Sequence, residues 1–159
     1  MNKIYILLGS NLGRSKEQLK KSRDLISKRV GKIIRQSGTY QTAAWGRTDQ
    51  PDFLNQVIVV ETMLPATETM KTLLEIEKNL GRTRNQKNEP RIIDIDILFF
   101  NKWIIEESGL TIPHPRIEDR RFVLVPVNEL SPRFTHPVSG KTIHHLLRVC
   151  PDKLTVKKI

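Results

Sequence analysis

The segment Arg91-Ile-Ile-Asp-Ile-Asp-Ile-Leu-Phe-Phe100 has the apolar content of a β-strand buried within a sheet. Side chains alternate along a strand, so Asp94 and Asp96 fall on one face together with Leu98. Two ionised carboxylates close to a core are costly unless a cation lies beside them. The residues predicted on the opposite face are all apolar: Ile93, Ile95, Ile97 and Phe99.

This carboxylate pair predicts a divalent-cation site. At a strand rise of about 3.3 Å per residue, the two side chains would stand about 6–7 Å apart. The alternatives are a strand end that faces water and an ion pair with Arg91. Apolar residues on both sides argue against the first, and one arginine cannot neutralise two carboxylates. Hard oxygen ligands suit Mg²⁺, which often shares substrate phosphates, so we expect Mg²⁺ with a nucleotide.

Working outward from this strand, hydrophobic periodicity predicts the order strand, helix, strand, strand, helix, strand. This order is typical of an α+β fold, the ferredoxin-like βαββαβ sandwich, here with an extra C-terminal hairpin and helices. The expected strands span residues 3–8, 32–40, 53–62 and 91–100, the helices 15–30 and 65–80, the hairpin 103–105 with 110–112, and the added helices 119–130 and 142–149.

Composition favours a single cytoplasmic domain, residues 1–159. The lone Cys150 excludes an internal disulfide, and the apolar start at residues 4–8 is too short for a signal sequence or a membrane span. A formal net charge of +10 favours a polyanionic ligand, which could be nucleic acid, an acidic membrane surface or a phosphorylated small molecule.

Polar or aromatic residues elsewhere are candidates for the same site. Glu77 continues the apolar stripe of its helix and needs a partner, which could also be a salt bridge within the fold. Phe53 and Asn55 share a strand face and suit a flat heteroaromatic ligand, although a lone aromatic is more often core. His114, held between two prolines, could donate a hydrogen bond to phosphate or could be merely structural.

The phosphates would need arginines, because the sequence has no glycine-rich loop of the form G-x-x-x-x-G-K-[ST]. The loop before the carboxylate strand carries Arg82, Arg84 and Arg91. The fork geometry of a guanidinium matches phosphate oxygens. We therefore expect this loop to replace a phosphate-binding loop.

Several motifs follow one another over roughly residues 4–130: Gly9-Ser-Asn-Leu-Gly13, Gln50-Pro-Asp-Phe-Leu-Asn55, Glu77 with Gly81-Arg-Thr-Arg84, Pro90-Arg-Ile-Ile-Asp-Ile-Asp96, and Pro113-His-Pro115 with Arg120 and Phe122. Together they resemble the 6-hydroxymethyl-7,8-dihydropterin pyrophosphokinase family of folate biosynthesis. The stretch from Pro90 to Asp96 is the most specific of them.

The resemblance implies transfer of the β,γ-pyrophosphoryl group of MgATP to the hydroxymethyl oxygen of a reduced pterin, with release of AMP. It implies two Mg²⁺ ions at Asp94 and Asp96, one bridging the α- and β-phosphates and the other the β- and γ-phosphates. Positioning and charge neutralisation would then make a strong general base unnecessary. We expect a monomer that binds these small-molecule substrates and neither nucleic acid nor a membrane.

The same resemblance implies roles for individual residues. Arg82 and Arg91 would be catalytic. The pterin would stack between Phe53 and Phe122, under loops around residues 43–49 and 82–90 that close and exclude water. Its other contacts would be Thr42, Ala43, Trp45 and Asn55, and the nucleotide would be bound by Glu77, Arg84, Ile97, Thr111, His114 and Arg120.

The chain departs from the family pattern in the arginine loop. Many members carry a Trp-Gly pair before the Pro-Arg, where this sequence has Lys87-Asn-Glu89. Trp45 would supply the missing aromatic cover from the other loop. Pro115 and Gly109 stand where members often have an aromatic and a basic residue, so nucleotide affinity would be lower.

Two other functions fit parts of the sequence. A basic βαββαβ sandwich also describes an RNA-binding module, but that module carries aromatics where this chain has Asp94 and Asp96. A pterin-binding protein without turnover would explain the altered arginine loop.

Overall fold

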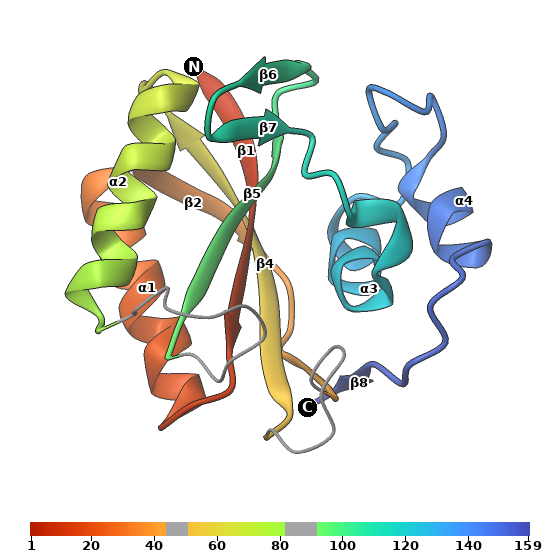
Figure 1. The fold of residues 1–159 in the computed structure, drawn as a ribbon, viewed down its shortest axis with the longest axis horizontal. Helices are drawn as coiled ribbons and strands as arrows, with labels where there is room; N and C mark the ends of the chain where they lie inside the picture. The colour runs from red at the N-terminus through yellow and green to blue at the C-terminus, as the bar shows by residue number, and fades with distance from the viewer. Residues whose placement is uncertain (44–50, 82–91) are drawn as a thin grey trace.

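Four antiparallel strands form the centre of the fold in a computed structural model that describes residues 1–43, 51–81 and 92–159 (Figure 1). Their order across the sheet is β5-β1-β4-β2, and each neighbouring pair is antiparallel. The order of elements along the chain and this pairing confirm the predicted ferredoxin-like α+β fold. The strands are β1 (Asn2–Ser10), β2 (Gly31–Gln36), β4 (Phe53–Thr62) and β5 (Asp94–Phe100).

Helices cover both faces of this sheet (Figure 1). On one face, α1 (Ser15–Arg29) and α2 (Ala66–Asn79) pack apolar side chains against alternate residues of the strands. On the other face lie α3 (Arg121–Leu130) and α4 (Ile143–Arg148). None of the helices in the described ranges has the length and apolar character needed to cross a bilayer.

The predicted strand over residues 32–40 is divided in two. β2 ends at Gln36, and a separate strand, β3 (Tyr40–Thr42), pairs farther along β4. At the break, the Ser37 hydroxyl accepts the Val57 backbone N–H at 3.0 Å. The Gln56 amide donates to the Ser37 carbonyl at 2.7 Å. These side-chain hydrogen bonds take the place of backbone hydrogen bonds between the two strands, so β2 ends before Ser37.

A β-bulge places Phe99 on the face opposite to the predicted one. The pairing of β5 with β1 shifts, since Ile6 is opposite Ile97 whereas Tyr5 is opposite Phe99. Leu98 is the extra residue, and it packs together with Phe99 on the face of α3 and α4. The two aspartates precede the bulge, so their predicted face is not affected by it.

The segments after β5 follow the prediction with shifted boundaries. The hairpin consists of β6 (Ile105–Glu107) and β7 (Leu110–Ile112), so its first strand begins where we expected it to end. A 3₁₀ turn, η1 (Ile117–Asp119), precedes α3. A last strand, β8 (Lys157–Lys158), was not predicted and pairs with β3.

Candidate active site

Asp94 and Asp96 lie half-buried at the start of β5. Asp96 is opposite Leu7, whose side chain packs on the side of α3 and α4, and Asp94 is opposite Gly9. Directly opposite residues share a face, so both carboxylates lie on that side. Within the described ranges, no group of three or more His, Cys, Asp or Glu side chains could hold a metal ion. Two carboxylates still fit Mg²⁺, because this ion usually completes its shell with water and substrate phosphates.

A buried carboxylate of α2 fixes the strand that carries the aspartates. Glu77 is 2% exposed, and its Oε2 accepts the backbone N–H of Ile95 at 2.6 Å. Because β5 is the edge strand of the sheet in the part of the chain that the structure describes, α2 supplies an acceptor there in place of another strand. The partner that the sequence required for Glu77 therefore includes a backbone amide.

His114 is tied to the same strand. Its backbone N–H donates to the Leu98 carbonyl at 3.1 Å, and its Nδ1 accepts the Arg116 backbone N–H at 3.3 Å. Burial first, and then the Arg120 cation, lower the pKa of His114 to about 4, although Asp94 acts in the opposite direction. The ring is therefore neutral near pH 7, with its proton on Nε2. This form can donate a hydrogen bond from Nε2, and the contact of His114 with phosphate stays a prediction.

Three of the predicted pterin contacts lie together on β3 and β4. Thr42 is opposite Phe53, and the Asn55 Nδ2 donates to the Thr42 Oγ1 at 3.3 Å. Asn55 and Thr42 are buried, whereas Phe53 is half-buried. They occupy the sheet face of the aspartates, because Asn55 alternates in step with Val57 on the side of α3.

The role of Gly9 was not recognised from the sequence. Gly9 lies between Asn55 and Asp94 across the sheet. A Cβ on Gly9 would lie 2.8 Å from the Asn55 Oδ1, closer than real Cβ atoms approach. Only glycine leaves the amide in place, and the strand register that creates this contact cannot be read from the motif alone.

Arg120 and Phe122 come from the beginning of α3. The Arg120 guanidinium carbon lies 5.8 Å from the centre of the Phe122 ring, a cation–π distance. Phe122 packs at the margin of the core on this side of the sheet. Arg120 is also near enough to His114 to affect its pKa. Candidate phosphate and pterin contacts thus meet at one end of α3.

The remaining candidates are spread more widely. The Ile97 side chain is buried in the core under α1 and α2, so only its backbone can meet a ligand on the edge of β5. Thr111 is exposed on β7, and Ala43 is exposed after β3. Four predicted residues lie outside the described ranges: Trp45, Arg82, Arg84 and Arg91.

The sequence profile of the 7,8-dihydro-6-hydroxymethylpterin-pyrophosphokinase (HPPK) family matches residues 5–132. The chain is 38% identical over 141 residues to a 2-amino-4-hydroxy-6-hydroxymethyldihydropteridine pyrophosphokinase of Synechocystis, covering 88% of this chain and 72% of that protein. With the protein of the same name from Methylorubrum extorquens, identity is 34% over 148 residues, or 92% of each chain.

Some longer proteins contain a segment that is similar to this chain. "Folic acid synthesis protein fol1" of Pneumocystis carinii is 39% identical over 140 residues, which are 88% of this chain but 19% of that protein. The crystal structure of a Plasmodium falciparum HPPK-DHPS triple mutant with SDX-DHP superimposes with a TM-score of 0.78 at 21% identity, covering 92% of this chain and 44% of that one. The structural match supports the fold, and the profile and the bacterial relatives establish the family. The chain belongs to the 7,8-dihydro-6-hydroxymethylpterin-pyrophosphokinase family.

Proposed function

We propose that Asp94 and Asp96 bind two Mg²⁺ ions in the reaction that this chain catalyses as an HPPK. That reaction is pyrophosphoryl transfer from ATP to hydroxymethyldihydropterin in folate synthesis. The hydroxymethyl oxygen releases its proton and forms a bond to the β-phosphorus, the bond from that phosphorus to the α,β-bridging oxygen breaks, and AMP leaves. The observation that carries the proposal is the pair of half-buried carboxylates on one face of β5, beside a neutral His114.

The metal ions would supply charge neutralisation for the phosphates and orientation for the attacking hydroxyl. Asp94 and Asp96 suit this role because they are held on a strand rather than on a loop. Glu77 supports their placement through Ile95. Counting Mn²⁺ bound in the presence of a non-hydrolysable ATP analogue should give two ions per wild-type chain and fewer in Asp94→Asn.

The pterin ring is proposed to lie between Phe53 and Phe122. The support is that both rings are half-buried and border the same sheet face. The Asn55 amide would read the polar edge of the pterin, together with the backbone at Thr42 and Ala43. The glycine at position 9 leaves space for this amide. Trp45 would cover the ring, and unchanged pterin affinity in Trp45→Ala would remove it from this role.

The phosphates are proposed to contact His114 through Nε2 and Arg120 through its guanidinium. The support is that His114 lies near enough to both Asp94 and Arg120 for each charge to affect its pKa. Arg82, Arg84 and Arg91, which belong to the predicted phosphate loop, would complete the set. Among these arginines, Arg82 and Arg91 would stabilise the charge that develops during transfer.

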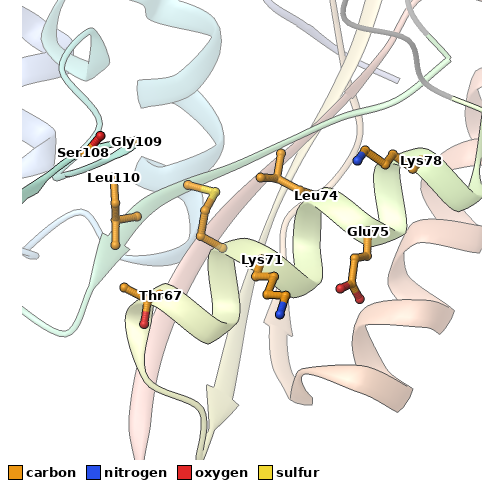
Figure 2. A pocket seen from close by; sticks show the side chains of 9 residues that line it. Thr67, Lys71, Leu74, Glu75, Lys78, Ser108, Gly109 and Leu110 are labelled. Carbon is orange, nitrogen blue, oxygen red and sulfur yellow. The ribbon is translucent and has the colours of Figure 1, made fainter.

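The nucleotide is proposed to extend from the outer edge of β5 toward α2. A hollow of about 400 Å³ lies between α2 and the turn of the β6–β7 hairpin. Figure 2 shows the side chains that line it. Leu74 of α2 and Leu110 of β7 line it from opposite elements, and Lys78 lies at one end. Glu77 and Thr111, both predicted nucleotide contacts, directly adjoin these lining residues in sequence. The exposed Gly109 in the turn adds no side chain to this hollow.

Replacing Arg82 or Arg91 by Ala tests whether the proposed catalytic groups act in the transition state. We expect a large loss in the rate of AMP formation with only a modest change in the pterin dissociation constant. Arg133→Ala is the matched control, because it removes an exposed arginine that has no role in the proposed site. Rates equal to wild type in both loop variants would exclude both arginines from that role.

A further inference from the structure

The Glu129 carboxylate of α3 lies beside three donors at the edge of the sheet formed by β3 and β8, opposite to the edge formed by β5. Its carboxylate accepts the Tyr40 hydroxyl, the Gly38 backbone N–H at 3.2 Å to each oxygen, and the Lys158 ammonium at 3.5 Å. The donors come from two segments that are more than a hundred residues apart in sequence. Glu129 therefore joins β8 and the start of β3 to α3.

β8 also closes the free edge of β3. Lys158 is opposite Tyr40 and Lys157 is opposite Gln41, while the Ile159 backbone N–H donates to the Thr39 carbonyl at 2.9 Å. β3 has three residues, and without β8 it would pair with β4 alone among the described strands. An edge strand of that length has few hydrogen bonds to keep it in place.

The Lys158 side chain reaches Glu129 across Gly38. A Cβ on Gly38 would lie 2.4 Å from the Lys158 Cε, so a side chain at this position would block that path. Burial and the bond to Glu129 raise the pKa of Tyr40 to about 12. Burial acts to raise the pKa of Glu129, but the bonds from Tyr40, Gly38 and Lys158 outweigh it and lower that pKa. The Glu129 carboxylate is therefore stabilised in its charged form by the three donors around it.

The same strand leads directly into the proposed pterin site. Tyr40 is opposite Asn55 on β4, and two residues later the Thr42 hydroxyl accepts the Asn55 amide. A shift of β3 along or away from β4 would therefore move the acceptor that orients the Asn55 side chain. Because that amide is buried, losing its partner would be costly.

We propose that β8 and Glu129 form a strap that positions β3, and through Thr42 the Asn55 amide, for the pterin. Glu129 and Lys158 are positioning residues that act through the strand and do not touch the substrate. The inference rests on the proposed pterin site. The family profile ends at residue 132, so β8 lies beyond the matched segment, and this strap is a feature of the chain that the match does not describe.

The test measures the dissociation constants of 6-hydroxymethyl-7,8-dihydropterin and of a non-hydrolysable ATP analogue separately. In Glu129→Gln we expect pterin binding to weaken about three- to tenfold, because the neutral amide oxygen accepts weaker hydrogen bonds than the carboxylate does, with nucleotide binding unchanged. Lys158→Met should weaken pterin binding in the same direction but less, because the ion pair is partly exposed. Lys158→Arg should restore it.

Lys157→Met is the matched control, since it removes the same charge from the same strand and the Lys157 side chain has no partner within the described ranges. Asn55→Ala is the reference for loss of the pterin site itself. Weak pterin binding in Asn55→Ala with wild-type binding in Glu129→Gln and Lys158→Met overturns the strap and keeps the site. Wild-type binding in Asn55→Ala overturns the site and the strap together. Parallel losses of pterin and nucleotide binding would show general destabilisation and also overturn the strap.

Discussion

The carboxylate of Glu77 accepts the backbone N–H of Ile95 at 2.6 Å, and Ile95 separates the two aspartates of the proposed metal site along β5. A helix on one face of the sheet thereby fixes a strand whose functional side chains project from the other face. Glu77 is nearly inaccessible to water, so removing one partner of this hydrogen bond and leaving the other unpaired would be costly.

Replacing Glu77 by Leu should destabilise the fold by about 1–3 kcal/mol, because the Ile95 N–H would be left without this acceptor. Glu77→Gln, whose amide oxygen can still accept, should lose less. Urea unfolding measures both free energies. Glu68→Gln, an exposed change on the same helix, should cost only a few tenths of a kcal/mol. Equal stability of Glu77→Leu and wild type would contradict the anchoring role.

Gly9→Ala should weaken pterin binding, because the added methyl group would displace the Asn55 amide. The decisive comparison is made in an Asn55→Ala background, where the clashing oxygen is absent. There the second substitution should add little, so the two effects should be strongly non-additive. Calorimetric titration with the pterin measures this, and simple additivity would show that Gly9 acts through another contact.

His114→Ala should reduce kcat/KM for ATP about 10- to 100-fold, the range expected for a lost hydrogen bond to a charged phosphate. Steady-state kinetics at saturating pterin measures the loss. His144→Ala removes an exposed imidazole on α4 and should leave the constant unchanged. If His114→Ala equals that control, the imidazole has no part in nucleotide binding.

In Tyr40→Phe, the free energy of unfolding should decrease less with rising pH in the alkaline range than it does in wild type. The folded pKa of Tyr40 is raised to about 12 by burial and Glu129, whereas an unfolded tyrosine ionises near about 10. The stability that this group contributes is therefore complete below about pH 10 and is lost as the pH rises toward about 12. The free energy of unfolding, measured by urea unfolding at several pH values between about 10 and about 12, should fall less steeply with pH in Tyr40→Phe than in wild type. Equal slopes in the two proteins would contradict the burial of this hydroxyl.

Much of the fold could be predicted because its strands and helices have clear periods. β4 coincides with the predicted residues 53–62, and α2 ends next to Gly81, whose φ of +94° favours glycine. Features that depend on contacts distant in sequence were missed. The break at Ser37 is made by side-chain hydrogen bonds, the bulge at Leu98 depends on register with β1, and β8 has only two residues, both lysines.

For the site, alternation was sufficient to place the two aspartates on one face of β5, and Phe53 with Asn55 on one face of β4. That the two pairs share one side of the sheet follows from the strand pairing. The sequence singled out His114 between two prolines, but its neutral state, caused by burial beside Arg120, depends on the fold. Gly9 and Glu129 act through neighbours across the sheet, which no spacing in the sequence reveals. A single domain over residues 1–159, a monomeric state, a cytoplasmic location and an absence of nucleic-acid binding stay predictions.

The role of the two aspartates is tested by measuring AMP formation from ATP with 6-hydroxymethyl-7,8-dihydropterin and Mg²⁺ in wild type, Asp94→Ala and Asp96→Ala. We expect AMP formation that requires both the pterin and Mg²⁺ in the wild type and that is nearly abolished in each variant, while both variants retain pterin binding. AMP formation at the wild-type rate in either variant would contradict the assignment of the metal site to this pair of aspartates.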